Sequence, residues 1–191
     1  KMKKIFISVF ILLVSIPLSF KLHSKLQKKG CFALEKNLPF SLSNNEISSN
    51  FIALGDFGTG KKAQYEVSQS IKSLCKKKRC DFVALLGDNF YERGTNSVFD
   101  EQFNTKFESV YKGIKIPFYP VLGNHDVKGD YLSQLFYSLR NKFWSFPNTY
   151  YSLKNNLLNF FALNSNCSIL QWKQYQYLSS KKAVDNWTFV F

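Results

Sequence analysis

Residues 82–91 read FVALLGDNFY, an apolar run that is closed by a glycine and followed by a polar cluster. Such a short run, ended by glycine, is typical of a strand buried on both faces. The pattern recurs in FIALGDFG at residues 51–58 and in FYPVLGNHD at residues 118–126. Between these runs, at about residues 62–75 and 98–111, apolar residues recur at helical spacing. This alternation predicts an α/β fold with a parallel sheet and crossover helices.

Beyond the third polar cluster the sequence predicts two further helices and more extended chain. A helix is expected at about residues 130–139, and an extended pair at residues 150–153 and 157–163. A last helix at about residues 172–181 leads into residues 187–191, which resemble the start of another strand. Because the sequence ends within that element, we expect the natural protein to continue further.

The composition indicates one globular domain with a large core. Of 191 residues, 45% are hydrophobic and 17% aromatic. The formal net charge of +13 would attract phosphorylated substrates, anionic lipid or nucleic acid without choosing among them. The densest basic run, residues 76–79, has no interleaved aromatic residues and no nucleic-acid motif. We expect a solvated turn there and no nucleic-acid partner.

The N-terminal fifty residues differ from the rest of the chain. Lysines precede an apolar run at residues 5–20, which predicts a signal peptide or an uncleaved N-terminal anchor within residues 1–20. Residues 21–50 are polar and aperiodic, as in a linker or an ordered arm, and the domain occupies residues 51–191. We therefore expect a secreted or otherwise extracytoplasmic, lumenal protein that contacts a membrane only through residues 5–20, if these act as an anchor.

Four cysteines would be oxidised in such a compartment. They are Cys31, Cys75, Cys80 and Cys167, and three complete pairings are open to them. Cys75 and Cys80 could close a small loop around the lysine run. A zinc site is disfavoured, because the CxxC spacing is absent and neither histidine lies near them.

The polar clusters carry the candidate chemistry. The carboxyl ends of parallel strands meet at one edge of a sheet, where ligands bind. Alone, a Gly-Asp after a strand is usually a turn, Tyr91 a half-buried aromatic residue and His125 a structural histidine. Taken together at three strand ends, these residues indicate a metal site of hard oxygen ligands with a phenolate among them, which suits iron(III) and a divalent partner. The residues that converge are Asp56, Asp88, Tyr91, Asn124 and His125.

These blocks, GDFG, GDNFY and GNHD, resemble those of the purple, tartrate-resistant acid phosphatases of the metallophosphoesterase (calcineurin-like) superfamily. The resemblance extends over about residues 51–191 and includes residues 103–107 and 144–147. It implies a β-sandwich flanked by helices (αββα), incomplete at its C-terminus. It also implies an acid phosphatase that uses a metal-activated hydroxide as nucleophile. Its substrates would be small phosphomonoesters, with phosphoproteins as a further class.

The resemblance further implies a role for each residue. Asp56 and Tyr91 would bind iron(III), Asp88 would bridge two metals, and Asn124 would bind the divalent ion, which is Fe(II), Zn(II) or Mn(II). His125 would contact the phosphate and assist the leaving group. The phenolate on iron(III) would give the purple colour.

One departure from the family pattern is large. The family needs three more metal-binding histidines downstream, whereas this chain holds only His23 and His125. We expect a longer parent protein to supply them, and the 191 residues alone to hydrolyse little.

Two other interpretations remain. Residues 55–61, GDFGTGK, match a phosphate-binding P-loop, although Asp56 would repel phosphate and Lys62 stands where a Ser or Thr should hold magnesium. The chain could also be a catalytically inactive, phosphatase-like membrane anchor or scaffold.

Overall fold

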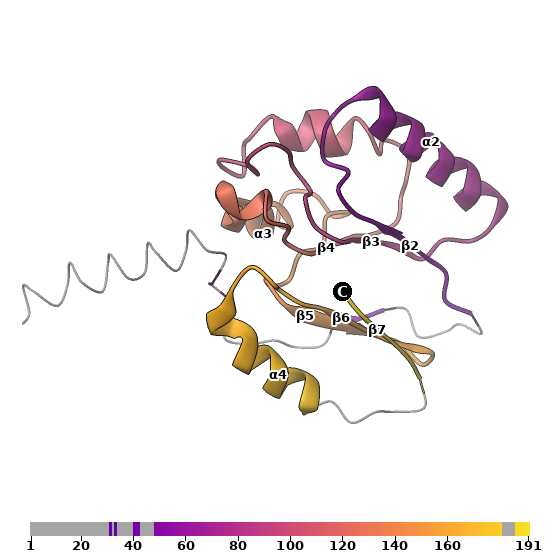
Figure 1. The fold of residues 1–191 in the computed structure, drawn as a ribbon. Helices are drawn as coiled ribbons and strands as arrows, with labels where there is room; N and C mark the ends of the chain where they lie inside the picture. Colours follow the sequence, from indigo (N-terminus) through magenta and orange to yellow (C-terminus); the bar gives the residue numbers. More distant parts are fainter. Residues whose placement is uncertain (1–30, 32, 34–39, 43–47, 181–185) are drawn as a thin grey trace, which may run out of the picture.

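The computed structural model describes residues 31, 33, 40–42, 48–180 and 186–191. Two sheets pack face to face, with helices on both outer faces (Figure 1). This arrangement confirms the expected αββα sandwich. The predicted leader within residues 1–20 lies outside the described residues. No helix in the described part of the chain is long and apolar enough to cross a bilayer.

The first sheet is three-stranded and parallel, as the alternating pattern predicts. Its strands are β2 (Phe51–Leu54), β3 (Phe82–Leu85) and β4 (Phe118–Pro120), with β3 in the centre. Every residue of β3 is buried, which explains its uninterrupted apolar sequence. Helix α2 (Lys62–Lys77) makes the crossover from β2 to β3.

The predicted helix over residues 98–111 is wrong in its extent. The structure has only a short π-helix, η1 (Asn104–Glu108), extended by one turn on its N-terminal side. The carboxylate of Asp100 accepts the backbone N–H groups of Asn96 and Gln102, which closes a turn and prevents an earlier helix start.

The second sheet has the order β1-β5-β6-β7. Strands β5 (Tyr151–Lys154) and β6 (Leu158–Ala162) are the predicted extended pair and form an antiparallel hairpin. Strand β7 (Trp187–Val190) runs parallel to β6. Strand β1 (Phe40–Ser41), from the predicted arm, pairs with β5.

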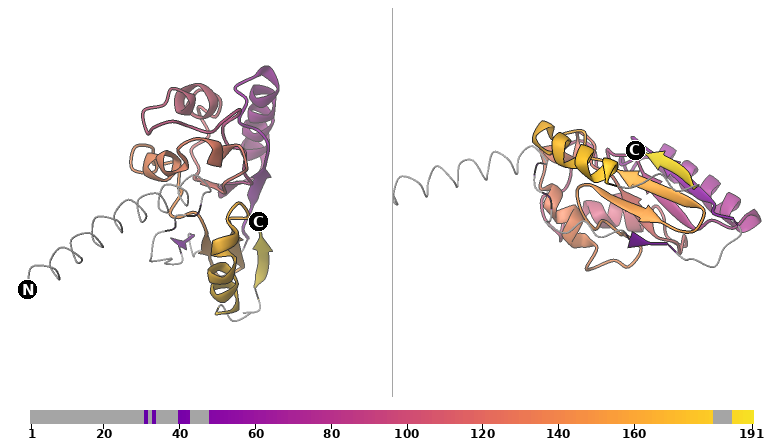
Figure 2. Two further views of the ribbon diagram at one scale, coloured as in Figure 1. Left: turned by 60° about the vertical axis from the view of Figure 1, so that its left-hand side comes forward. Right: turned by 90° about the horizontal axis from the view of Figure 1, so that it is seen from below.

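Four short helical segments complete the described part of the fold. Helix α4 (Gln171–Ser179), preceded by η3 (Ser168–Leu170), covers the outer face of the second sheet (Figure 2). On the opposite side of the molecule, η2 (Asp126–Lys128) and α3 (Tyr131–Tyr137) follow β4.

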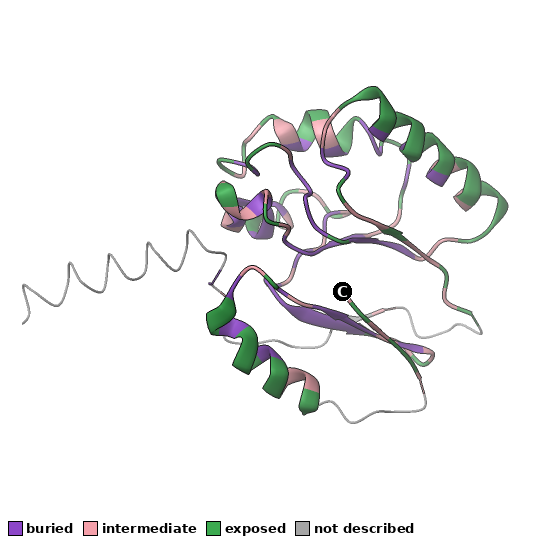
Figure 3. Ribbon diagram, viewed as in Figure 1, coloured by how far each residue is buried: buried purple, intermediate pink, exposed green. Residues whose placement is uncertain are grey.

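Strands β3 and β6, at the centre of the molecule, are almost entirely buried (Figure 3). Aromatic rings from both sheets pack against each other between them. Phe82 from β3 stacks on Phe51 with ring centroids 5.1 Å apart, and it meets the edge of Phe160 from β6 at 5.7 Å. Phe82 and Phe160 are fully buried. Each such ring contributes about 2–3 kcal/mol by leaving water, so these contacts fix how the sheets pack.

Two disulfides resolve the pairing that the sequence leaves open. Cys31 pairs with Cys167, which ties the predicted arm to the segment before η3. Cys75 pairs with Cys80 and closes the lysine-rich loop between α2 and β3. Residues 76–79 are solvent-exposed, as expected, but the predicted turn is wrong for Lys76 and Lys77, which form the last turn of α2.

Candidate metal centre

The three polar blocks meet at the carboxyl edge of the first sheet because glycines let their backbones approach closely. A Cβ atom on Gly58 would lie 1.9 Å from the carbonyl oxygen of Asn89. A Cβ atom on Gly123 would lie 2.1 Å from the backbone nitrogen of Asp88. Only glycine fits at either position, so the first block packs on the second and the second on the third.

Both aspartates that end a strand adopt a left-handed backbone conformation. Asp56 has φ 53° and Asp88 has φ 54°. Such a conformation costs roughly 1 kcal/mol or more for a residue with a side chain, and it is concentrated at functional sites. Hydrogen bonds between the blocks hold it: the N–H of Asp56 donates to Gly87 O at 3.2 Å, and that of Gly58 to Asp88 O at 3.2 Å.

The phenol of Tyr91 lies between the two carboxylates. Its oxygen is 2.9 Å from Oδ1 of Asp56 and 2.8 Å from Oδ2 of Asp88. These two carboxylate oxygens are therefore within about 6 Å of each other, a spacing that suits a pair of metal ions about 4 Å apart. Desolvation, followed by the hydrogen bonds to Asp88 and Asp56, raises the pKa of Tyr91 well above its ordinary value.

The oxygen atoms of this cluster are suited to binding a cation. A phenol has one proton, whereas both oxygens that face it are acceptors, so negative charge and acceptor capacity exceed the donors present. Hard oxygen ligands of this type are what iron(III) prefers. The described residues contain no group of three or more His, Cys, Asp and Glu side chains that could hold a metal.

The third block contacts the second through His125. The backbone N–H of His125 donates to Oδ1 of Asp88 at 3.0 Å, and its ring lies 4.6 Å from the Tyr91 ring. Nδ1 of the imidazole is 2.6 Å from the carbonyl oxygen of Glu92. A carbonyl oxygen only accepts hydrogen bonds, so Nδ1 carries a proton and donates it to this contact. Nε2 is then the ring nitrogen that can take up or release a proton. Asn124, the preceding residue, is exposed at the same strand end.

Asp126 organises the blocks, and the sequence analysis gave it no role. Its side chain is fully buried, and its carboxylate accepts five hydrogen bonds. The donors are the backbone N–H groups of Asn89, Phe90 and Gly123 and the side-chain amides of Asn89 and Gln134. Burial raises the pKa of Asp126 to about 6, against the opposite effect of the bonds from Gln134, Gly123 and Asn89.

Lys106 is a second support that sequence reasoning missed. Its ammonium group donates to the carbonyl oxygen of Tyr91 and, at 2.7 Å, to Oε1 of Gln102. Desolvation lowers the pKa of Lys106. No signal separates this lysine from the others in the sequence, because the contact depends on how η1 packs beside the second block.

The P-loop interpretation fails on the first block, because its backbone amides are already engaged. The N–H of Gly60 donates to Oε1 of Gln64 at 2.6 Å, and that of Lys61 to Oγ1 of Thr59 at 3.2 Å. A phosphate cradle needs such amides free to face the ligand. The Asp56 carboxylate moreover accepts a hydrogen bond from the Tyr91 hydroxyl at 2.9 Å.

Comparison with known proteins identifies the family of the chain. The chain matches the calcineurin-like phosphoesterase family over residues 49–188, and it belongs to that family.

Among curated proteins it is similar to tartrate-resistant acid phosphatase type 5 of Mus musculus, 34% identical over 54% of this chain and 35% of that protein. It is also similar to purple acid phosphatase 3 of Arabidopsis thaliana, 37% identical over 51% of this chain and 28% of that protein. The matches thus span about a third of these relatives. A solved structure titled "GAP50 the anchor in the inner membrane complex of Plasmodium" matches with a TM-score of 0.58 and 26% identity, over 69% of this chain and 49% of that chain.

Proposed function

We propose that the protein to which this chain belongs is an acid phosphatase that hydrolyses phosphoric monoesters at a binuclear metal centre. The observation that carries the proposal is the position of the Tyr91 phenol between Asp56 and Asp88. A phenolate beside two carboxylates at adjacent strand ends suits iron(III), and the curated proteins to which the chain is similar include purple and tartrate-resistant acid phosphatases.

The position of each residue indicates its proposed role. Asp56 and Tyr91 would hold iron(III), Asp88 would bridge it to Fe(II), Zn(II) or Mn(II), and Asn124 would bind that divalent ion. Such a pair of cations acidifies a water molecule and clamps the phosphoryl oxygens. The Asp126 carboxylate, which accepts hydrogen bonds from the second block, and the Lys106 ammonium, which donates one to it, keep that block in place.

His125 is the proposed proton donor to the leaving oxygen. The Glu92 carbonyl fixes the ring by accepting from Nδ1, so a proton enters and leaves at Nε2. The ammonium of Lys128 lies 3.3 and 3.4 Å from the two ring nitrogens. Its charge would draw the anionic phosphoester toward the imidazole.

The two disulfides support an extracytoplasmic location, since such bonds persist in oxidising compartments. We propose a secreted or lumenal enzyme whose substrates are small phosphomonoesters or phosphoproteins. The proposed signal peptide or anchor would direct it there.

A comparison of colour and activity tests the proposal. The iron-loaded parent protein should absorb in the visible range, and Tyr91→Phe should bleach it more than it lowers phosphatase turnover. Phenolate-to-iron charge transfer requires the oxygen, whereas hydrolysis chiefly requires the cations. Tyr65→Phe, on the exposed side of α2, is the matched control and should keep both. A Tyr91→Phe protein that stays purple would remove Tyr91 from the iron site.

The similarity to GAP50 supports a second candidate, an inactive anchor or scaffold. The two candidates differ in metal content. An acid phosphatase parent purifies with about two metal ions per chain and hydrolyses p-nitrophenyl phosphate, while a scaffold of this fold does neither even after metal loading.

A further inference from the structure

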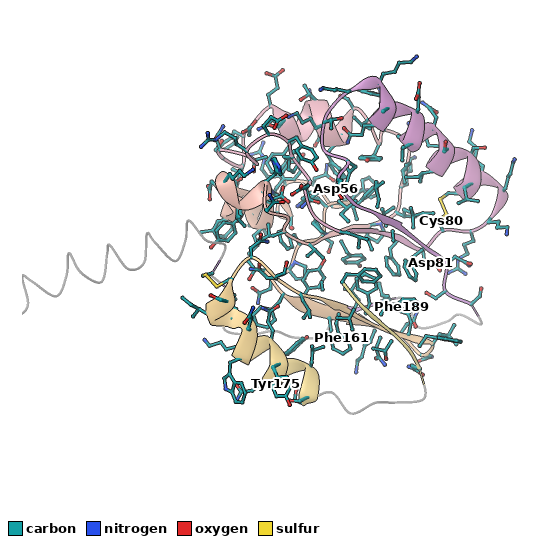
Figure 4. The ribbon with its side chains drawn as sticks, viewed as in Figure 1. Asp56, Cys80, Asp81, Phe161, Tyr175 and Phe189 are labelled. Atoms are coloured by element: carbon teal, nitrogen blue, oxygen red, sulfur yellow. A yellow bond between two sulfur atoms is a disulfide. The ribbon has the colours of Figure 1, made fainter. Side chains whose placement is uncertain are left out.

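The amino edge of the first sheet, opposite the metal cluster, carries a separate basic surface. Two loops form its centre: residues 78–81 lead from α2 into β3, and residues 112–117 lead into β4. Figure 4 shows Asp56 at one end of this sheet and Cys80 and Asp81 at the other. Whatever binds the amino edge therefore lies away from the proposed catalytic residues.

Two cavities lie side by side on this edge. One has a volume of about 420 Å³, and the aromatic rings of Phe107, Phe118 and Phe143 contribute to its lining. The other has a volume of about 520 Å³ and is lined in part by Ile114 and Ile116. Both volumes are in the range of cavities that take up ligand groups.

The cavities share the wall formed by residues 113–115. Gly113, which belongs to that wall, is exposed, and a Cβ atom placed on it would meet nothing within 4 Å. Because the cavities share these residues and the backbone at Gly113 faces solvent, one extended ligand that passes over Gly113 would reach both cavities.

The rims of both cavities are strongly basic. Six cationic side chains line them: Lys72, Lys76, Lys112, Lys115, Arg140 and Lys142. The single acidic residue in either lining is Glu108, and its carboxylate already accepts from the Tyr137 hydroxyl and, at 2.9 Å, from the Asn141 amide. The uncompensated charge favours an anionic ligand.

Helix-end electrostatics explains only part of this charge. Lys76 and Lys77 lie in the last turn of α2, where cations offset the helix dipole. Lys115 and Lys142 lie several residues beyond the ends of η1 and α3, outside the reach of that effect. Their presence on one rim points to a ligand.

The disulfide makes this surface rigid. Cys75 and Cys80 both line the second cavity, and their bond closes the loop that carries residues 76–79. A loop that is fixed before binding loses little conformational entropy when a ligand arrives, which increases affinity.

We propose that this amino-edge surface docks an extended acidic segment of a partner polypeptide, whose glutamate or aspartate side chains meet the rim while its apolar side chains enter the two cavities. A bilayer fits less well, because membrane-binding surfaces present protruding apolar side chains, whereas Phe107, Phe118 and Ile114 are buried at 3%, 1% and 7% exposure. Single-stranded nucleic acid would need exposed aromatic rings for stacking, and the aromatic rings of this lining are mostly buried.

Fluorescence anisotropy with a labelled peptide tests the proposal. The probe alternates glutamate and leucine over ten residues, and it is titrated with the whole chain in 0.15 M salt. We expect micromolar binding that the double variant Lys112→Glu/Lys115→Glu weakens by tenfold or more. The matched control Lys154→Glu/Lys173→Glu makes the same charge change at exposed positions on β5 and α4 and should alter binding less than twofold. Circular dichroism establishes that both variants fold.

Four outcomes would overturn the proposal. An all-glutamate peptide that binds as tightly would show that the cavities take up nothing. Equal weakening by the control variant would reduce the effect to net charge. Binding to vesicles with 30% phosphatidylserine in place of the peptide would assign the surface to a membrane. Dimerisation of the chain that the Lys112/Lys115 variant abolishes, without peptide binding, would assign it to a second copy. The assay measures neither metal nor turnover, so its result is independent of the proposed phosphatase activity.

Discussion

Replacing the Asp126 carboxylate with an amide should destabilise the domain more than any exposed charge change does. In Asp126→Asn, an NH₂ group takes the place of one carboxylate oxygen. If it replaces Oδ2, it faces the N–H groups of Asn89 and Gly123; if it replaces Oδ1, it faces those of Phe90 and Gln134. In either orientation at least two buried donors lose their acceptor.

The magnitude follows from those unpaired groups. Each buried donor without a partner costs about 1–3 kcal/mol, so the free energy of unfolding should fall by about 3 kcal/mol at pH 7.5. Urea unfolding of the metal-free chain, followed by tryptophan fluorescence, measures this difference. Trp144 reports on the same region, since its indole nitrogen donates to Gln134 O at 2.8 Å.

The matched control is Asp130→Asn, which removes the same charge four residues later at an exposed position. It should change the free energy of unfolding by less than about 0.5 kcal/mol. If Asp126→Asn is no more destabilised than Asp130→Asn, the carboxylate does not hold the three blocks together and our account of the site is wrong.

Further predictions concern pH, packing, catalysis and the disulfides. Because burial raises the pKa of Asp126 in the folded state to about 6, its contribution to the free energy of unfolding of the metal-free chain should decrease by up to about 3 kcal/mol as the pH rises from about 4 to 6. If the difference in the free energy of urea unfolding between the unchanged chain and Asp126→Asn does not vary with pH, this prediction is wrong. Gly123→Ala should cost more than about 2 kcal/mol in the same assay, since its Cβ would lie 2.1 Å from backbone of the second block; a neutral effect would show that the blocks are loosely packed. His125→Ala in the iron-loaded parent should keep the colour and lower turnover about a hundredfold, as removal of a general acid does, and full activity would exclude that role. Replacing Cys31 and Cys167 by serine should lower the free energy of unfolding by up to about 5 kcal/mol, whereas removing the Cys75–Cys80 bond should lower it by about 2 kcal/mol. The reason is that the first disulfide spans 136 residues and the second 5. Equal shifts of the urea midpoint in the two variants would refute this chain-entropy argument.

The sequence predicted the parts of the site that depend on strand topology. The position of Asp56, Asp88 and Tyr91 at one edge follows from three apolar runs that each end in glycine, and the structure brings these three side chains into contact. Their metal-binding roles, and those of Asn124 and His125, remain predictions. The three-stranded parallel sheet could be predicted for the same topological reason.

Contacts between distant residues could not be predicted. Asp126 binds partners 36 and 37 residues earlier, and no local pattern announces that contact. The start of η1 depends on Asp100, whose side chain competes with the helix for backbone amides. The pairing of Cys31 with Cys167 joins residues 136 positions apart, which composition alone does not reveal.

Protein contacts hold the residues of the proposed metal site in place. Two aspartates hold left-handed conformations that would relax in a flexible loop, and they persist because bonds between the blocks and the Asp126 carboxylate hold the backbone. It follows that Asp126→Asn should weaken iron binding as well as folding, although Asp126 contacts no proposed ligand side chain among the hydrogen bonds described. Equilibrium dialysis without urea, at a temperature at which the variant is fully folded, separates the two effects. Loss of iron affinity in the folded variant would establish Asp126 as a positioning residue. Unchanged affinity would confine its role to stability.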